Sequence, residues 1–185
     1  GIAFVASIDA YDNNLIKKHE HTKPAKELDR IKNMKALNAQ TGPVLLTYID
    51  NTRLDNLINE YISENEPIYS VVSNADVHHK IWKIDGINSV NHVMNALNDL
   101  DSLYIADGHH RSAAASKVRE LKMNANSKHK GDEDYNYFLA VAFPKSKMTI
   151  LDYNRLIKTT NGHSSNELIA LIEKNFKCTL SDRPV

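Results

Sequence analysis

The stretch "YIADGHHRSAAAS", residues 104–116, constrains the fold more than any other part of this sequence. An apolar run, 103–106, ends at Asp107-Gly108, and two histidines, an arginine and a series of small residues follow. This order predicts a buried strand, a tight glycine turn and a helix that packs closely on the sheet. The chain therefore combines strands and helices in one core, and polar side chains gather where the strand meets the helix.

Apolar periodicity along the rest of the chain predicts further strands interspersed with amphipathic helices. Several strands follow each other across short turns, which favours hairpins over purely parallel crossovers. We expect an α+β fold in which a mixed β-sheet has helices on its flanks. The predicted strands are 2–8, 15–18, 44–49, 68–73, 77–84, 103–106, 137–143, 148–153 and 176–180, with hairpins over 2–18, 68–84 and 137–153. The predicted helices are 22–39, 54–62, 90–97, 109–122 and 168–172, and a polar loop is predicted over 124–136.

Length and charge limit the classes of protein to which this chain can belong. Its 185 residues, of which 42% are hydrophobic, suffice for a single domain over 1–185. Lys plus Arg total 23 and Asp plus Glu total 23, so the formal net charge of zero argues against a nucleic-acid-binding protein. The single cysteine, Cys178, excludes an intrachain disulfide framework.

The ends of the chain and its hydropathy bear on its location. No apolar run approaches the roughly 20 residues that a membrane-spanning helix needs. The first residues have no basic leader, so we expect a cytoplasmic protein without membrane contact. Because the chain begins inside a predicted strand and ends without a cap, we also expect it to be a fragment of a longer protein. Nothing in the sequence indicates an oligomeric state.

The turn after the strand has the chemistry of an anion-binding site. Asp107 is placed to cap the helix through its carboxylate, and Gly108 permits close approach of the backbone. The amides of His109, His110 and Arg111 would then lie at the positive end of the helix, where phosphate groups bind. The Arg111 guanidinium can grip phosphate in two places, and the histidines can donate hydrogen bonds to the same oxygens. The alternative is a capped helix whose histidines and arginine are only solvated.

The histidine spacing does not predict a metal site. His109 and His110 are adjacent, so they point about 100° apart on a helix, whereas zinc-binding pairs lie three or four residues apart. His78 and His79 lie on a predicted strand and face its opposite sides.

Two further residues are candidates for the same site. Glu20, between His19 and His21, is placed to act as a general base or magnesium ligand beside the phosphate, with a surface salt bridge as the alternative. Arg155 follows a predicted strand and is a candidate second phosphate contact, with a structural ion pair as the alternative.

Three blocks of the sequence resemble the family called domain of unknown function 1015. The blocks are "YIADGHHR" at 104–111, the segment 17–48 that ends in "LNAQTGPVLLTY", and "FLAVAFPKSKMTILDYNRLIK" at 138–158. The resemblance runs over nearly the whole chain. That family is similar to the ParB/sulfiredoxin-like superfamily, so the resemblance implies a ParB/sulfiredoxin-like core.

The resemblance also implies a ligand. Members of that superfamily carry a Gly-x-x-Arg turn at a helix start that holds nucleotide phosphate, and here Gly108 and Arg111 match. The branch with the most similar turn includes free-serine kinases, which move a phosphoryl group from ADP or ATP to the serine hydroxyl with magnesium. ATP or ADP with Mg²⁺ is therefore the implied cofactor. Family members are longer than this chain, and no counterpart of the kinases' catalytic glutamate is found. The implied binding residues are Asp107, Gly108, His109, His110 and Arg111.

The sequence leaves two functions open. The first is an ATP- or ADP-dependent phosphotransferase for a small hydroxylated metabolite such as free serine, with Asp107, His110 and Glu20 as catalytic residues. In this hypothesis Asp107 caps the turn and holds magnesium through water, while His110 stabilises the transferring charge. The second is a ParB-like, nucleotide-binding regulatory module without catalysis. Both expect a nucleotide as ligand, and the first adds a small-molecule substrate.

Overall fold

The computed structural model describes residues 1–151 and 156–179. The chain divides into two compact units, Gly1–Met148 and Thr149–Val185. Two such units can belong to one domain, so the single domain expected over 1–185 stays a prediction. None of the described helices is long and apolar enough to cross a membrane.

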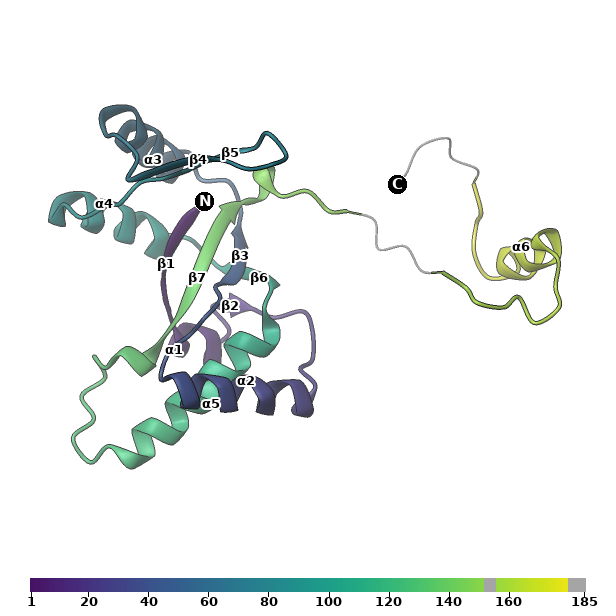
Figure 1. Ribbon diagram of the computed structural model, residues 1–185, viewed down its shortest axis with the longest axis horizontal. Coiled ribbons are helices and arrows are strands. Elements are labelled where there is room, and N and C mark those ends of the chain that lie inside the picture. The colour runs from purple at the N-terminus through teal and green to yellow at the C-terminus, as the bar shows by residue number, and fades with distance from the viewer. Residues whose placement is uncertain (152–155, 180–185) are drawn as a thin grey trace. The chain divides into compact units, whose positions relative to one another are not determined.

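A five-stranded mixed sheet forms the centre of the first unit (Figure 1). Its strand order is β1-β7-β3-β6-β2, in which β7 is antiparallel to β1 and parallel to β3, while β6 is antiparallel to β3 and parallel to β2. This mixed sheet with flanking helices confirms the predicted α+β class. The strands are β1 (Ile2–Ser7), β2 (Ile16–Lys17), β3 (Val44–Tyr48), β6 (Leu103–Asp107) and β7 (Tyr137–Pro144).

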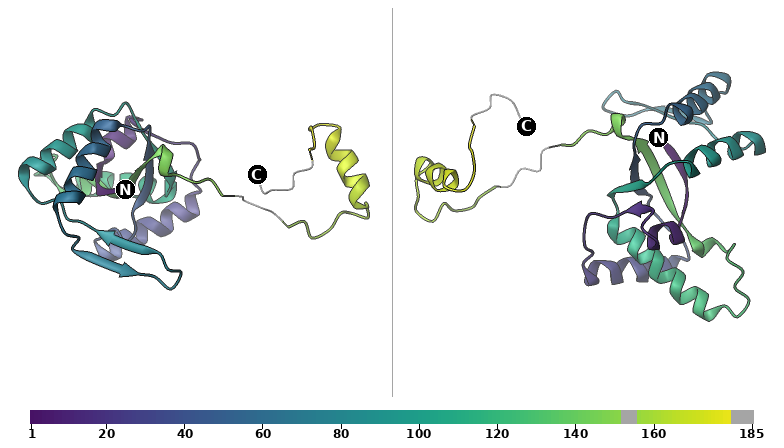
Figure 2. Two further views of the ribbon diagram at one scale, coloured as in Figure 1. Left: turned by 90° about the horizontal axis from the view of Figure 1, so that it is seen from above. Right: turned by 180° about the vertical axis from the view of Figure 1, so that it is seen from behind.

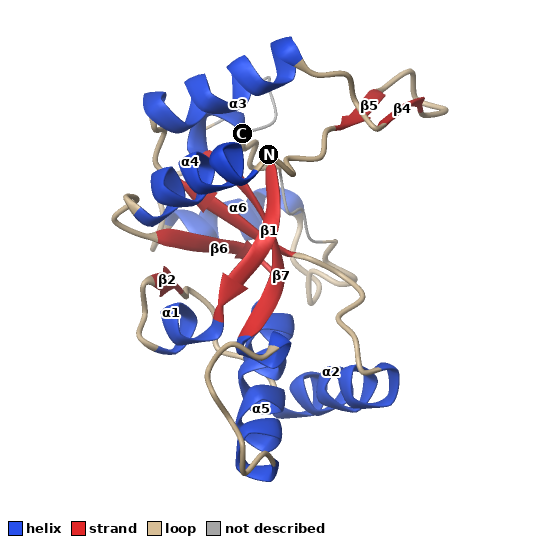
Figure 3. Ribbon diagram, turned by 90° about the vertical axis from the view of Figure 1, so that its left-hand side faces the viewer, coloured by secondary structure: helices blue, strands red, loops and turns tan. Residues whose placement is uncertain are grey.

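Helices cover the sheet in two groups, which Figures 1 and 3 show at opposite ends of its strands. Helices α3 and α4 pack together at one end, and α2 packs on α5 at the other. The short α1 lies beside α5 and β2. The helices of the first unit are α1 (Ile8–Asp12), α2 (Pro24–Leu37), α3 (Thr52–Glu64), α4 (Ile87–Asn98) and α5 (His109–Ala125), with 3-10 turns at Asp134–Asn136 and Lys145–Lys147.

The core follows from the alternation of side chains along the strands. Every second residue of β7 is buried, as in a strand whose one face packs on helices. Leu46 on β3, Ile105 on β6 and Phe138 on β7 are each at most 1% exposed and form the centre of the apolar cluster. The same cluster fixes the end of β6, and therefore the start of α5, relative to β3.

Two smaller features complete the fold. Strands β4 (Tyr69–Val72) and β5 (His78–Ile81) form the predicted antiparallel hairpin, which extends away from the five-stranded sheet (Figure 2). In the second unit, α6 (Ser165–Glu173) begins with a capping box in which Ser164 Oγ accepts from the Glu167 amide at 3.4 Å.

The hairpin expected over 2–18 was wrong. Ser7 caps a short helix instead, because its Oγ accepts a hydrogen bond from the Ala10 amide at 3.3 Å. Ile8 and Tyr11 then lie on one face of α1, and both are buried. The returning strand β2 pairs in parallel with β6 rather than with β1.

The hairpin expected over 137–153 was also wrong. After Pro144 the chain enters a 3-10 turn, which is held by a hydrogen bond from the Ser146 amide to Asp50 Oδ1 at 3.0 Å. Strand β7 takes both its neighbours, β1 and β3, from earlier in the chain. Residues 148–151 and 176–179 are not strands; residues 152–155, with Arg155, and residue 180 lie outside the described residues.

Candidate functional site

Gly108 makes the sharp turn between β6 and α5 possible. Its φ is +102°, in the left-handed region where a side chain is strained. A Cβ atom here would lie 3.1 Å from Arg111 Nε and 3.3 Å from the Cα of Val44. Glycine is therefore required both by the backbone and by the space around it.

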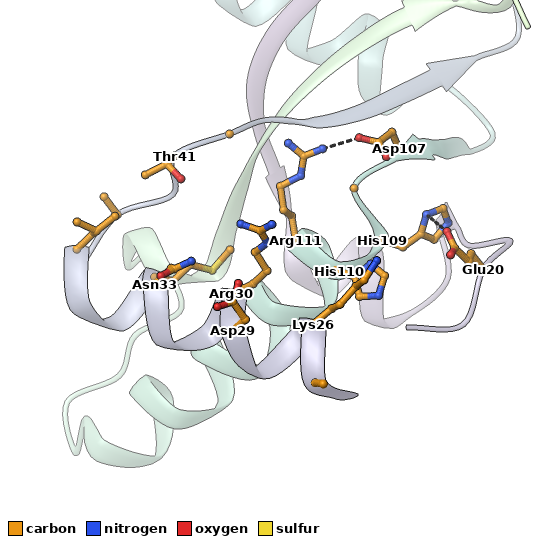
Figure 4. Close-up of a pocket in the computed structure, with 16 residues that line it drawn as sticks. Glu20, Lys26, Asp29, Arg30, Asn33, Thr41, Asp107, His109, His110 and Arg111 are labelled. Atoms are coloured by element: carbon orange, nitrogen blue, oxygen red, sulfur yellow. Dashed lines mark hydrogen bonds and ion pairs between the residues drawn. The ribbon is translucent and has the colours of Figure 1, made fainter. Parts of the chain in front are cut away.

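Asp107 does not cap α5, which corrects the sequence expectation. The N-cap residue is Gly108, and no side chain caps the helix there. The Asp107 carboxylate instead accepts a hydrogen bond from Arg111 Nη2 at 2.7 Å, one helical turn away (Figure 4). The ion pair is open to solvent, since the Asp107 side chain is 74% exposed.

Only two of the three predicted backbone donors have no acceptor within the helix. The Arg111 amide donates to the Gly108 carbonyl at 2.9 Å, so it serves the helix itself. The amides of His109 and His110 occupy the first two positions of α5, where no carbonyl within the helix can accept them. The phosphate cradle expected from three amides is therefore reduced to two.

His109 is buried, and its ring accepts a hydrogen bond. Its side chain is 4% exposed, its Nε2 accepts from the His19 amide at 3.4 Å, and its Nδ1 lies 3.6 Å from Glu20 Oε2. Burial, reinforced by the ring of His19 whose centroid is 4.4 Å away, lowers the pKa of His109 below its ordinary value of 6.5. An Nε2 that accepts leaves the proton on Nδ1, facing the Glu20 carboxylate.

His110 is also occupied by the chain. Its Nε2 accepts a hydrogen bond from the Lys23 amide at 3.1 Å. The two adjacent imidazoles thus hold the segment 19–23, which leads into α2, against the start of α5. They position the wall of the site, a role that the sequence did not suggest.

Of the residues expected at the site, the six that the structure describes all line one cavity of about 730 Å³, and Arg155 lies outside the described residues. The six are Glu20, Asp107, Gly108, His109, His110 and Arg111.

Helix α2 and the segment after it supply the rest of the wall, a part of the site that the sequence analysis left unassigned. Their lining residues are Ala25, Lys26, Asp29, Arg30, Asn33, Met34, Leu37, Ala39, Thr41 and Gly42. The available signal was a repeat of three and four residues along one face of α2, namely Lys26, Arg30, Asn33 and Leu37.

Gly42 has an unexpected role in the wall. A Cβ atom at this position would lie 3.0 Å from Arg111 Nη1, so the Arg111 side chain fills the space that both Gly42 and Gly108 leave open. The neighbouring Gln40 faces elsewhere, because its amide group bonds the backbone of Tyr137 and Leu139 on β7.

The charges of the cavity wall balance. Three cationic side chains (Lys26, Arg30, Arg111) face three carboxylates (Glu20, Asp29, Asp107). In the described part of the chain, no group of three or more His, Cys, Asp or Glu residues is arranged to hold a metal ion. Such a wall complements a ligand that carries both signs of charge, for example an anion that brings its own cation.

Comparisons with known proteins add the family. The family model described as "Protein of unknown function (DUF1015)" matches residues 1–184. No curated protein and no solved structure matches the chain. The match spans the strand, the turn and every residue of the cavity, and the chain belongs to this family of proteins of unknown function.

Proposed function

We propose that the cavity binds the phosphate groups of a magnesium nucleotide, ATP or ADP, beside the start of α5. The observation that carries the proposal is the convergence of two free amides, an arginine and a wall of balanced charge on one cavity of about 730 Å³. Volumes of 300 to 1,000 Å³ are typical of small-molecule sites. The proposal includes a ParB/sulfiredoxin-like core and a cytoplasmic location, both on the resemblance described above.

Each group has a place in this binding. The amides of His109 and His110 donate to one phosphate at the positive end of the helix. Mg²⁺ is commonly held by one or two carboxylates together with substrate phosphates, so Asp107 fits as its protein ligand, directly or through water. With Asp107 engaged in holding Mg²⁺, Arg111 would leave the ion pair and could donate hydrogen bonds to phosphate oxygens.

We further propose that the protein transfers the terminal phosphoryl group to the hydroxyl of a small metabolite such as free serine. The acceptor oxygen forms the new bond to phosphorus, the bond to the leaving nucleotide oxygen breaks, and the acceptor proton passes to the Glu20 carboxylate. Glu20 is 59% exposed and lines the cavity, so an acceptor can reach it. His110 contributes as a positioning residue, because its ring already accepts from Lys23.

A regulatory nucleotide-binding module without catalysis is the second candidate. The observation that favours it is the engagement of both histidines by the chain, which leaves neither Nε2 free to move a proton. This candidate needs the same nucleotide site and no acceptor.

Thermal unfolding and a phosphotransfer assay test the proposal and separate the two candidates. We expect ATP or ADP with Mg²⁺ to raise the Tm, and labelled phosphate to pass to an acceptor from a panel of hydroxylated metabolites that includes serine. Glu20→Gln should keep the Tm shift and lose transfer by about 100-fold or more, as expected when a general base is removed. Binding without transfer would favour the regulatory module, and the lack of any nucleotide-dependent shift would overturn both.

A further inference from the structure

Helix α2 turns an unusual face to the cavity. Lys26, Arg30, Asn33 and Leu37 follow one another at helical spacing and all line the cavity wall. None of the residues of α2 is buried. A stripe at this spacing is ordinarily apolar and packs on the core. Here most of it is polar or charged, so its side chains meet the cavity instead of the core.

Within the residues that the structure describes, Arg30 is a cation without an acidic partner. It forms no ion pair with any residue in the described parts of the chain, whereas Arg111 is held by Asp107 at 2.7 Å. Its guanidinium extends from α2 toward Arg111 on the cavity side (Figure 4). An anion that enters the cavity can accept charge-assisted hydrogen bonds from both guanidinium groups.

The cavity wall changes character along α2. Lys26 and Arg30 lie toward the start of the helix, while Met34, Leu37 and the following Ala39 form an apolar end. Arg30 and Leu37 are seven residues apart, which corresponds to roughly 10 Å along the helix axis. A matching ligand has an anionic group at one end and an apolar or planar group at the other.

We infer that Arg30 is a second phosphate clamp, which selects a nucleoside di- or triphosphate over a compound with a single phosphate. This inference rests on the proposed function, because it assigns a second phosphate in the same site. The amides at the start of α5, together with Arg111, hold one phosphate group. Arg30 holds the next phosphate group of the nucleotide. The apolar end of the cavity, lined by Met34 and Leu37, then accommodates the nucleotide base.

The test compares affinities for phosphate chains of different length, by calorimetry on the whole chain with inorganic phosphate, tripolyphosphate and ATP, each with Mg²⁺. The variant is Arg30→Gln, and the matched control is Lys32→Gln, an exposed residue of the same helix that does not line the cavity. We expect Arg30→Gln to weaken tripolyphosphate and ATP about 10-fold while phosphate binding changes less than about twofold, since one charge-assisted contact is lost only with the longer chain. Lys32→Gln should leave all three affinities unchanged.

The outcomes separate this inference from the proposed function. If the unaltered chain binds none of the three probes, the proposed function fails and the inference falls with it. If the unaltered chain binds the probes, two results would refute the role of Arg30 as a second phosphate clamp. Arg30→Gln could have the same affinities as Lys32→Gln, or it could lose affinity for phosphate and for tripolyphosphate equally. In either case the proposed nucleotide site stands. Circular dichroism of both variants confirms that each is folded.

Discussion

At the scale of single residues, Gly108 is the position on which the site depends most. It combines a left-handed φ of +102° with close neighbours, whereas Gly131 has a similar φ of +96° and open space around it. A comparison of the two glycines therefore distinguishes the effect of backbone strain, which both share, from the effect of crowding, which only Gly108 has. Any residue other than glycine at position 108 must strain the turn and also displace Arg111.

Substitution of these two glycines by alanine is the corresponding prediction. Gly131→Ala should lower the free energy of unfolding by about 1–2 kcal/mol, the usual cost of a left-handed conformation. Gly108→Ala should cost about 1 kcal/mol more, since crowding adds to the strain, and should weaken Mg·ATP binding as well. Urea denaturation and calorimetry measure the two effects. Equal losses in both variants, with binding intact, would show that the space around Gly108 is not needed.

At the scale of elements, α5 holds the segment 19–23 through two imidazole rings. His109 and His110 accept from the amides of His19 and Lys23, and a protonated ring cannot accept. The groups that face His109 are His19, Glu20, Asp107 and His110. Protonation of His109 would add repulsion toward His19 and break the contact with the segment, although Glu20 and Asp107 oppose this change.

This contact predicts a pH dependence of stability. The pKa of His109 is lowered in the folded state, so the unfolded chain takes up the proton first as the pH falls. The contribution of His109 is fully present above pH 6.5 and is lost as the pH falls from 6.5 toward the lower folded-state pKa. Denaturation at pH 7.5 and 5.5 should show a decrease in the free energy of unfolding that His109→Gln reduces and His78→Gln, on the exposed β5, does not. An identical decrease in the free energy of unfolding of the unaltered chain and both variants would contradict a role of His109 in this pH dependence.

The elements also show what a sequence can predict. The β4–β5 hairpin and the helices α3 to α5 were predicted correctly, because their apolar spacing and turn residues are local. Strand β2 was assigned the wrong partner, since its neighbour Tyr104 is far away in the sequence from Lys17 and the parallel pairing leaves no local signal.

The site was predicted only in part, because some of its residues are close together in the sequence and others are not. Residues 107–111 are contiguous and were found from one motif, but the capping role of Asp107 was wrong because an ion pair with Arg111 competes with capping. Arg30 and Lys26 look like ordinary surface charges until α2 is placed against α5.

At the scale of the whole molecule, the balanced charge of the chain is repeated in the cavity. A net charge of zero gives no general attraction for anions. The proposed binding therefore depends on local groups at the start of α5 and on α2, and in this proposal Mg²⁺ offsets the carboxylates. The central claim is that nucleotide phosphate binds at the start of α5.

An NMR titration of the ¹⁵N-labelled chain with Mg·ATP tests this claim most directly. The largest amide shift changes should occur at His109 and His110, whose N–H groups have no acceptor within the helix, and Gly131 should stay unchanged. Saturable shifts at these two amides are the predicted result. Saturable shifts confined to other parts of the chain, or none up to millimolar nucleotide, would contradict it.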